Sequence, residues 1–203
     1  VVSNYDCGTL LSDTFIVEVL DSVVAGVLSF DDFELCFNET LDYSSSSPSG
    51  GSEGFEYFWH QTDENGDWQV ISTSLTDQVQ DVQYTFSGFI EYVNSCSAVN
   101  SDTLELIVNP LPDNPNLLGE LDVCNNSIDN YYSIDMPAGP WYFSWTAENG
   151  NITSGETVDE ILVDWLEGEI FSSLDLTVTN YETDCSSDNS WEINVTEISA
   201  PPA

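Results

Sequence analysis

The five cysteines are the residues of this chain with the clearest capacity for chemistry. Cys7, Cys96 and Cys185 follow one another at intervals of 89 residues, and Cys36 and Cys124 are 88 residues apart. Cysteine side chains pair as disulfides, remain as buried thiols or bind zinc. Zinc is disfavoured here, because the sequence has no Cys-x-x-Cys pair and only one histidine.

The carboxylates are the second group of reactive residues. There are 37 Asp and Glu side chains and no Lys or Arg, which gives a formal net charge of −37. Each carboxylate must therefore face water, accept N–H hydrogen bonds or bind a metal ion. The same charge excludes nucleic-acid binding and anionic membrane surfaces, since both would repel the chain. No apolar run approaches the roughly 20 residues of a membrane-spanning helix, so no membrane insertion is expected.

Calcium is the metal that these residues would suit, because hard cations take oxygen ligands from carboxylates, amides and carbonyls. The main candidate set is Asp113, Asn114, Asn116, Glu120 and Asp122. Smaller acidic groups are Asp21, Asp31 and Asp32, and a predicted hairpin tip with Asp63, Asn65 and Asp67. None of these sets has EF-hand spacing. Since Asp and Asn favour turns without any metal, a purely structural role stays open for each set.

No catalytic constellation is visible in the sequence. His60 stands alone beside Trp59 in a predicted strand, where a packing or surface role is expected. A catalytic triad or a glycosidase carboxylate pair would need a cleft, and small domains with short loops offer little room for one. The chain is therefore not expected to be an enzyme. The side chains of Trp68, Trp141 and Trp165 are candidates for a platform that stacks on sugar rings, with core packing as the alternative.

Short strands must position these residues, because no segment shows a 3.6-residue apolar period. Residues 29–36 alternate apolar and polar side chains up to Cys36. Asn65-Gly66 lies between aromatic-rich segments and predicts a hairpin, and residues 148–151 repeat this signal. Residues 79–92 predict two strands around Ser87-Gly88. Regular short strands with Gly, Asn and Pro turns indicate an all-β fold of antiparallel sandwiches.

The Cys96 region contains the most regular pattern of the chain. It predicts a strand, a turn that carries Cys96, a second strand up to residue 108, and a proline stop. A similar pattern surrounds Cys7, with the second strand at residues 16–19, and another surrounds Cys185. The spacing indicates tandem repeats of about ninety residues.

Domain limits follow from this period. Residues 1–20 are predicted to be the final strands of a preceding repeat. Residues 21–110 and 111–198 are predicted to be complete sandwiches, and residues 199–203 a linker to the next repeat. The chain is expected to be an excerpt or a processed form, since it lacks an initiator Met and a signal peptide.

The two predicted domains resemble known kinds of repeat. In the second, the residues that resemble a PKD-like repeat are Trp145, Asn149-Gly150-Asn151-Ile152, Ile161-x-Val163-x-Trp165 and Cys185. In the first, those that resemble an Ig-like repeat are Tyr57-x-Trp59, Asp67-Trp68, Tyr92, Cys96 and Val108-x-Pro110. Such repeats occur together in giant secreted surface adhesins of Bacteroidota, such as the SprB-type gliding adhesins.

This resemblance implies a structural segment of a cell-surface adhesin or filament, exported by the type IX system and used in attachment or gliding. The implied partners are neighbouring repeats of the same chain, with glycans or surfaces contacted by other domains. The missing Lys and Arg depart from the family, whose members often carry them in these strands. The alternative is a pair of carbohydrate-binding modules appended to a secreted enzyme.

The resemblance also implies covalent features. An early and a late strand that each carry a cysteine, with a Trp between them, resemble the inter-sheet bridge of Ig-like sandwiches. It implies the bonds Cys36–Cys96 and Cys124–Cys185, with Cys7 paired further upstream; buried free thiols are the alternative. Asp21-Ser22-Val23 and Asp102-Thr103-Leu104 resemble the short O-glycosylation motif of Bacteroidota, which implies glycans on Ser22 and Thr103.

Overall fold

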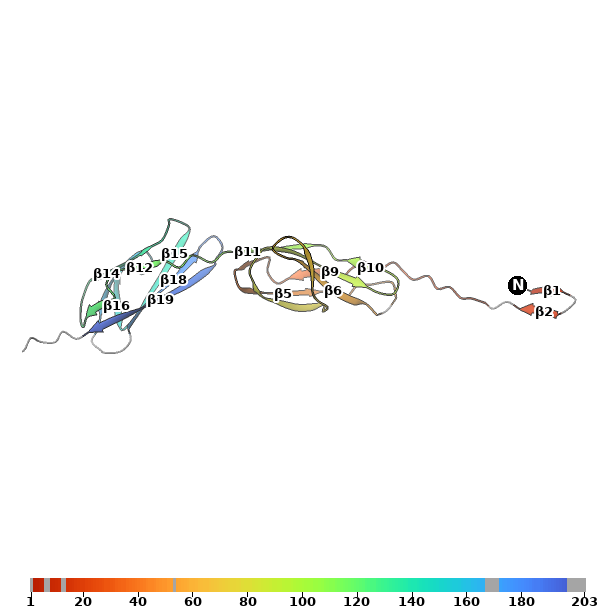
Figure 1. Ribbon diagram of the computed structural model, residues 1–203, viewed down its shortest axis with the longest axis horizontal. Coiled ribbons are helices and arrows are strands. Elements are labelled where there is room, and N and C mark those ends of the chain that lie inside the picture. The colour runs from red at the N-terminus through yellow and green to blue at the C-terminus, as the bar shows by residue number, and fades with distance from the viewer. Residues whose placement is uncertain (1, 6–7, 12–13, 53, 167–171, 197–203) are drawn as a thin grey trace, which may run out of the picture. The chain divides into compact units, whose positions relative to one another are not determined.

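The computed structural model describes residues 2–5, 8–11, 14–52, 54–166 and 172–196, and every regular element in these ranges is a β-strand. The predicted all-β fold class is therefore confirmed. The described residues contain no helix that is long and apolar enough to cross a membrane. Apart from an N-terminal hairpin, the strands form two consecutive β-sandwiches, each made of two sheets (Figure 1).

The N-terminal hairpin consists of β1 (Val2–Tyr5) and β2 (Gly8–Leu11), which pair antiparallel. The strand expected at residues 16–19 is not formed. Residues 14–23 have no regular structure, and the side chains of Ile16 and Val19 are 93% and 89% exposed. A strand needs a neighbour to satisfy its backbone groups, and none of the described residues pairs with this apolar segment.

The first sandwich contains β3 (Leu28–Phe30), β4 (Glu34–Cys36), β5 (Glu39–Ser45), β6 (Glu56–Thr62), β7 (Trp68–Ser72), β8 (Thr76–Val82), β9 (Phe86–Val93), β10 (Ala98–Asn100) and β11 (Leu104–Asn109). One sheet has the order β3-β5-β8. The other has the order β4-β11-β9-β6-β7, with β10 also paired to β9. The hairpin predicted at Asn65-Gly66 is confirmed, since Thr62 pairs with Trp68 across it.

The second sandwich contains β12 (Asn116–Leu118), β13 (Asp122–Cys124), β14 (Asn130–Asp135), β15 (Trp141–Glu148), β16 (Gly150–Ser154), β17 (Glu160–Trp165), β18 (Ser172–Asn180) and β19 (Ser186–Thr196). Its sheets have the orders β12-β14-β17-β16 and β13-β19-β18-β15. The hairpin expected at residues 148–151 was wrong, because β16 pairs with β17 in the opposite sheet. Asn149, at φ 60°, turns the chain from one sheet to the other after a single residue.

Both sandwiches begin in the same way, with one edge segment divided between the two sheets. β3 pairs antiparallel with β5, and β4 then pairs in parallel with β11. In the second sandwich β12 pairs antiparallel with β14, and β13 then pairs in parallel with β19. The predicted antiparallel sandwiches are thus observed with one short parallel pair in each.

The core of the first sandwich is built around Trp59, whose side chain is fully buried. Its ring stacks on Tyr43 of the opposite sheet, with centroids 4.3 Å apart, and the ring of Phe30 meets it edge-on at 5.8 Å. Alternation along β9 sends every second side chain into this core. The two sheets are therefore joined by aromatic packing.

Gly88 lies inside β9, where the sequence predicted a turn between two shorter strands. A Cβ atom at this position would lie 2.4 Å from the ring of Trp59. Glycine within a strand marks a close approach of another group, and here that group is the indole ring. The turn falls instead at residues 83–85, between β8 and β9.

We expect Gly88→Ala to destabilise the first sandwich by about 1–3 kcal/mol, since the added methyl group overpacks the core against the Trp59 ring. Urea unfolding followed by tryptophan fluorescence measures this difference. The matched control is Ser87→Ala on the opposite face of β9, with an expected change within about 0.5 kcal/mol. Equal effects of the two substitutions would contradict the packing argument.

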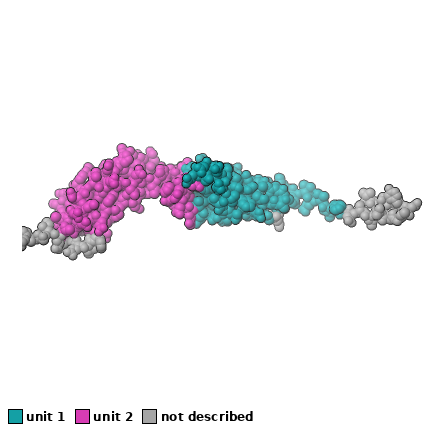
Figure 2. Space-filling view, viewed as in Figure 1, with its two compact units in different colours: residues 1–32, 41–79, 85–106 teal, residues 33–40, 80–84, 107–203 magenta. Residues whose placement is uncertain are grey.

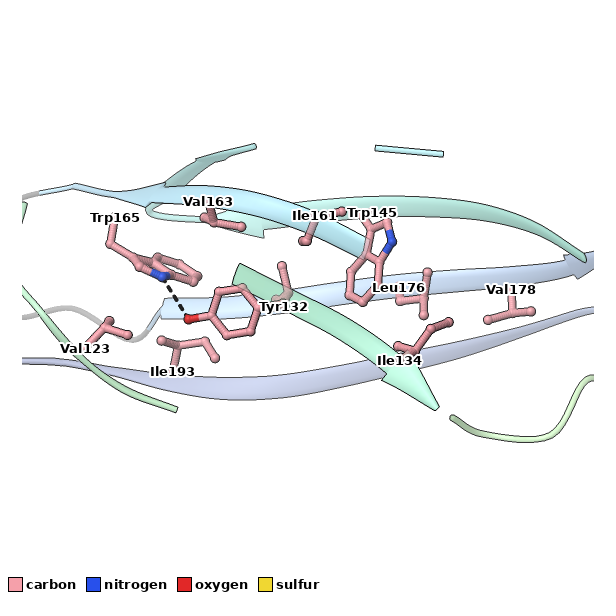
Figure 3. Close-up of a cluster of buried hydrophobic side chains, with 11 residues drawn as sticks. Val123, Tyr132, Ile134, Trp145, Ile161, Val163, Trp165, Leu176, Val178 and Ile193 are labelled. Atoms are coloured by element: carbon pink, nitrogen blue, oxygen red, sulfur yellow. Dashed lines mark hydrogen bonds between the residues drawn. The ribbon is translucent and has the colours of Figure 1, made fainter. Parts of the chain in front are cut away.

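The core of the second sandwich joins β14 and β17 of one sheet to β13, β15, β18 and β19 of the other (Figure 3). The Nε1–H of Trp165 donates to the hydroxyl of Tyr132 at 3.0 Å, and that hydroxyl donates to the carbonyl of Glu120 at 3.0 Å. The buried polar atoms of both aromatic side chains are thereby satisfied. Leu176 and Ile193 pack from the facing sheet.

The sheets exchange no strands between the two sandwiches within the described residues. The change from one sandwich to the other falls between Asn109 and Asn116, where the repeat period places the limit between residues 110 and 111. The chain also divides into two compact units, whose limits differ from those of the two sandwiches. One compact unit contains residues 1–32, 41–79 and 85–106, and the other contains residues 33–40, 80–84 and 107–203 (Figure 2).

Candidate functional site

A disulfide between Cys36 and Cys185 is the covalent site of the structure, with Cα atoms 5.5 Å apart. Both residues belong to the second compact unit, although they are 149 residues apart in sequence. Cys96 and Cys124 carry free, exposed thiols. The pairings Cys36–Cys96 and Cys124–Cys185 implied by the resemblance are therefore both wrong in this structure. Cys7 lies outside the described residues.

The strand register explains why the two cysteines of one repeat do not pair. Cys124 is opposite Thr196, at the end of β19, whereas Cys185 immediately precedes the first residue of the same strand. β19 has 11 residues, which at about 3.3 Å each places its ends roughly 35 Å apart. A disulfide requires Cα atoms within about 7 Å.

The first repeat repeats this geometry. Cys36 is opposite Asn109 at the end of β11, which runs antiparallel to β9, while Cys96 follows the end of β9 at Val93. The 8 residues of β9 account for more than about 20 Å. The early and late cysteines of each repeat thus lie at opposite ends of one sheet.

Local hydrogen bonds hold both partners of the observed bond. The backbone N–H of Cys36 donates to Oε2 of Glu39 at 2.7 Å. Cys185 is fully buried, and its carbonyl accepts the N–H of Asn180 at 2.9 Å. Asp184, at φ 58°, closes this turn. The sulfur atoms are thus presented by a strand and a turn whose backbone hydrogen bonds are satisfied.

The predicted calcium set is placed in and beside β12 and β13. Asp113, Asn114, Asn116, Glu120 and Asp122 are all exposed. One of them has a protein partner at its side chain, since Oδ1 of Asp122 accepts from Nδ2 of Asn194 at 2.9 Å. Among the described residues, no three side chains of His, Cys, Asp or Glu come together as a group that could hold a metal ion. Calcium binding stays a prediction.

Thermal unfolding with saturating calcium and with a chelator tests this prediction. If the set binds calcium, a hundredfold excess over the dissociation constant should add about 2.7 kcal/mol to the free energy of unfolding. The variant Asp113→Asn should weaken this gain. An unchanged melting temperature with calcium and with chelator would contradict the prediction.

The hairpin tip with Asp63, Asn65 and Asp67 is organised by hydrogen bonds within the turn. Oδ1 of Asp63 accepts the backbone N–H groups of Asn65 at 2.9 Å and Asp67 at 3.0 Å. An aspartate that caps its own turn in this way needs no cation. The structural alternative for this acidic group is therefore the one that the geometry supports.

The three tryptophans proposed as a sugar platform have different environments. Trp165 is 1% exposed and belongs to the core, so its assignment to a surface platform is wrong. Trp141 is half-buried, and its Nε1–H donates to the carbonyl of Pro137 at 2.8 Å. Trp68 is 46% exposed and meets the ring of Phe89 edge-on at 4.8 Å. Of the three, Trp68 presents the most accessible ring.

His60 has a packing role on the outer face of the sheet that contains β6 and β9. Its ring stacks on Phe89 with centroids 4.6 Å apart, and its Nε2 lies 3.1 Å from Oε2 of Glu91. Among the described residues this is the one contact between a basic side chain and a carboxylate, as expected for a chain without Lys or Arg. Ser22 and Thr103, the predicted glycosylation residues, are exposed, and their modification stays a prediction.

Buried tyrosines give the protein a pH dependence on the alkaline side. Burial raises the pKa of Tyr43, Tyr92 and Tyr132 above the usual value of 10.0. A pKa that is higher in the folded than in the unfolded state contributes stability below pH 10, and this stability is lost as the pH rises through the folded value. We expect the melting temperature to fall above about pH 10, together with phenolate absorbance. Measurement in 1 M salt separates this effect from repulsion among the carboxylates.

The second repeat is recognisable by sequence. Residues 111–195 match the PKD-like domain family. This match covers less than half of the chain, so it describes the second repeat alone. PKD-like domains are typically non-catalytic modules. A disulfide such as Cys36–Cys185 is typical of extracellular domains, because such bonds persist in oxidising compartments. A comparison with curated protein sequences finds no match.

Several solved structures are weakly similar to this chain. The fibronectin(III)-like modules of Clostridium thermocellum CbhA are 11% identical, with a TM-score of 0.34 over 84% of this chain and 95% of that one. Murine CEACAM1b is 10% identical, with a TM-score of 0.35 over 87% of this chain and 100% of that one. The Hoc capsid protein of bacteriophage RB49 is 13% identical, with a TM-score of 0.36 over 84% and 59%. Scores this low do not establish a common topology.

Proposed function

We propose that this chain is a structural repeat segment, a stalk or spacer, of a large secreted cell-surface adhesin or filament. The observation that carries the proposal is the bond between Cys36 of the first repeat and Cys185 of the PKD-like repeat. A covalent link between consecutive repeats suits a part that transmits load, since it limits how far the chain extends when a repeat unfolds. Such a bond is typical of oxidising compartments, which supports a location outside the cytosol.

The described surface supports a structural role in two further ways. The acidic hairpin tip is held by hydrogen bonds within its own turn. The side chains of Trp59, Trp145 and Trp165 are buried in the two cores, so they are not available to a ligand. The net charge of −37 keeps the chain soluble and opposes association with anionic surfaces. The resemblance to Bacteroidota adhesin repeats further supports export by the type IX system and a part in attachment or gliding.

Surface labelling of the source cells tests the location. Antibodies raised against residues 21–198 should label intact cells without permeabilisation, and the label should disappear after mild protease treatment. Solution scattering of the isolated chain tests the spacer role, for which an elongated particle is expected. Labelling confined to permeabilised cells, or a compact particle with one shared core, would overturn the proposal.

Carbohydrate binding is the second candidate function, and exposed Trp68 is the observation that favours it. Planar indole rings bury the apolar faces of sugars, and the neighbouring Phe89 holds this ring from one side. Glycan-array binding that is lost in Trp68→Ala would establish this function. Binding that survives this substitution, or an array with no signal, would leave the spacer role alone.

A further inference from the structure

Among the described residues, two exposed thiols remain beside the Cys36–Cys185 bond, and they are Cys96 and Cys124. Each is the equivalent, one repeat away, of a cysteine that is bonded. The spacing is 89 residues between Cys96 and Cys185 and 88 residues between Cys36 and Cys124.

Cys36 and Cys124 occupy the same position in their sandwiches. Cys36 is the last residue of β4 and lies opposite Asn109 of the parallel strand β11. Cys124 is the last residue of β13 and lies opposite Thr196 of the parallel strand β19. In each case the next N–H, at Phe37 or Asn125, donates back across the same pair at 2.9 Å.

Cys96 and Cys185 lie in the same connection of their sandwiches, after β9 and after β18, but at different places in its turn: Ser97, not Cys96, is the counterpart of Cys185. Cys96 follows β9 in a turn closed by Asn94, whose N–H donates to the carbonyl of Ser97 at 3.0 Å. Cys185 follows β18 in a turn closed by Asn180, whose N–H donates to the carbonyl of Cys185 at 2.9 Å. The side-chain oxygen of each Asn accepts a backbone N–H two residues later, both at 2.9 Å.

We propose that Cys36–Cys185 is one of a regular series of disulfide bonds, in which the early cysteine of each repeat bonds the late cysteine of the next. Each bond of this series is called a rung. Cys124 is then the bonding position for the late cysteine of a following repeat. Cys96 is the bonding position for the early cysteine of a preceding repeat. This inference rests on the repeat role proposed above and specifies how the repeats are joined.

Pairing of either thiol with the other cysteine of its own repeat is closed by geometry, because the early and late positions lie at opposite ends of a strand of 8 or 11 residues. By equivalence with the observed bond, the expected partner is a cysteine at the complementary position of a neighbouring repeat. The exposure of both thiols leaves them accessible to it.

The chemistry of each rung balances as thiol–disulfide exchange. Two thiols lose two protons and two electrons as the S–S bond forms, and a disulfide-form oxidant accepts them and becomes two thiols. The rungs overlap in sequence, because a bond that starts at Cys124 begins before the bond that ends at Cys185. Every residue between the first and last rung is then enclosed in at least one covalent loop.

An in-register tandem of the full chain tests the proposal. Residues 1–198 are followed directly by residues 21–203, so that the first sandwich of the second copy follows the PKD-like repeat of the first copy. Cys7→Ser and Cys96→Ser in the first copy, with Cys124→Ser in the second, leave one new pair: Cys124 of the first copy and Cys96 of the second. The protein is refolded with oxidised glutathione and mapped without reduction. Because the chain has no Lys or Arg, pepsin replaces trypsin.

The expected result is a monomer with no free thiol, two Cys36–Cys185 bonds and one Cys124–Cys96 bond between the copies. The control tandem with Cys124→Ser in the first copy should have one free thiol, at Cys96. Two free thiols per monomer, or Cys124–Cys96 bonds only between separate molecules, would overturn the proposal. Those results would leave the spacer role intact, whereas cells that fail surface labelling would remove that role and leave the bond pattern standing.

Discussion

Replacing Cys36 with serine should lower the free energy of unfolding by up to about 5 kcal/mol. The bond that it removes spans a sequence separation of 149 residues, and the loop-closure entropy of the unfolded chain grows with that length. Cys36 is the better partner to replace, because Cys185 is fully buried and a serine there would add a desolvation cost of its own. Calorimetric melting of the oxidised protein measures the loss.

The matched control is Cys96→Ser. Its thiol is exposed and free, so the expected change is within about 0.5 kcal/mol. Addition of a reductant should lower the stability of the parent protein to that of Cys36→Ser and leave Cys36→Ser unchanged. A map without reduction that contains Cys36–Cys96 or Cys124–Cys185 would reinstate pairing within each repeat.

Replacing Trp165 with alanine should destabilise the second sandwich by about 3–5 kcal/mol. The side chain is 1% exposed, so its removal leaves a large cavity beneath β17. The hydroxyl of Tyr132 also loses the indole N–H that donates to it at 3.0 Å (Figure 3). Chemical unfolding followed by circular dichroism measures this loss.

Trp68→Ala separates burial from the mere loss of a tryptophan. Trp68 is 46% exposed and contacts the edge of Phe89, so the expected change is less than about 1 kcal/mol. Equal destabilisation by the two substitutions would contradict the assignment of Trp165 to the core. The same pair informs the glycan experiment, because loss of binding in Trp165→Ala would report unfolding, whereas loss in Trp68→Ala would report the surface.

Much of the local structure was predictable because it depends on neighbouring residues. The alternation along β9 and β18 and the Asn65-Gly66 turn are properties of a few consecutive side chains. The turn that carries Cys96 follows from Asn94, whose side chain accepts two backbone N–H groups. Such signals are read directly from the chain, and they sufficed for the all-β class.

The acidic candidates show where local signals become ambiguous. The same Asp and Asn residues suit a calcium ion and a capped turn, and composition does not distinguish the two. At Asp63 the hydrogen bonds to Asn65 and Asp67 identify the turn. The tryptophans were ambiguous for the same reason, because an aromatic ring in an alternating strand faces the core or the solvent according to its register.

Sequence established the residue types, the period of the repeats and the alternation of their strands, because these are properties of adjacent residues. Tertiary structure decided the partners. Cys124 and Cys185 have the spacing of a bridge within one repeat, yet β19 separates them by its full length and places Cys185 against Cys36 instead. Gly88 was predicted to lie in a turn, but it lies inside β9, where the ring of Trp59 occupies the space that a Cβ atom would fill. Pairing depends on which groups converge after the sheets pack, and that information is held by contacts far apart in the chain.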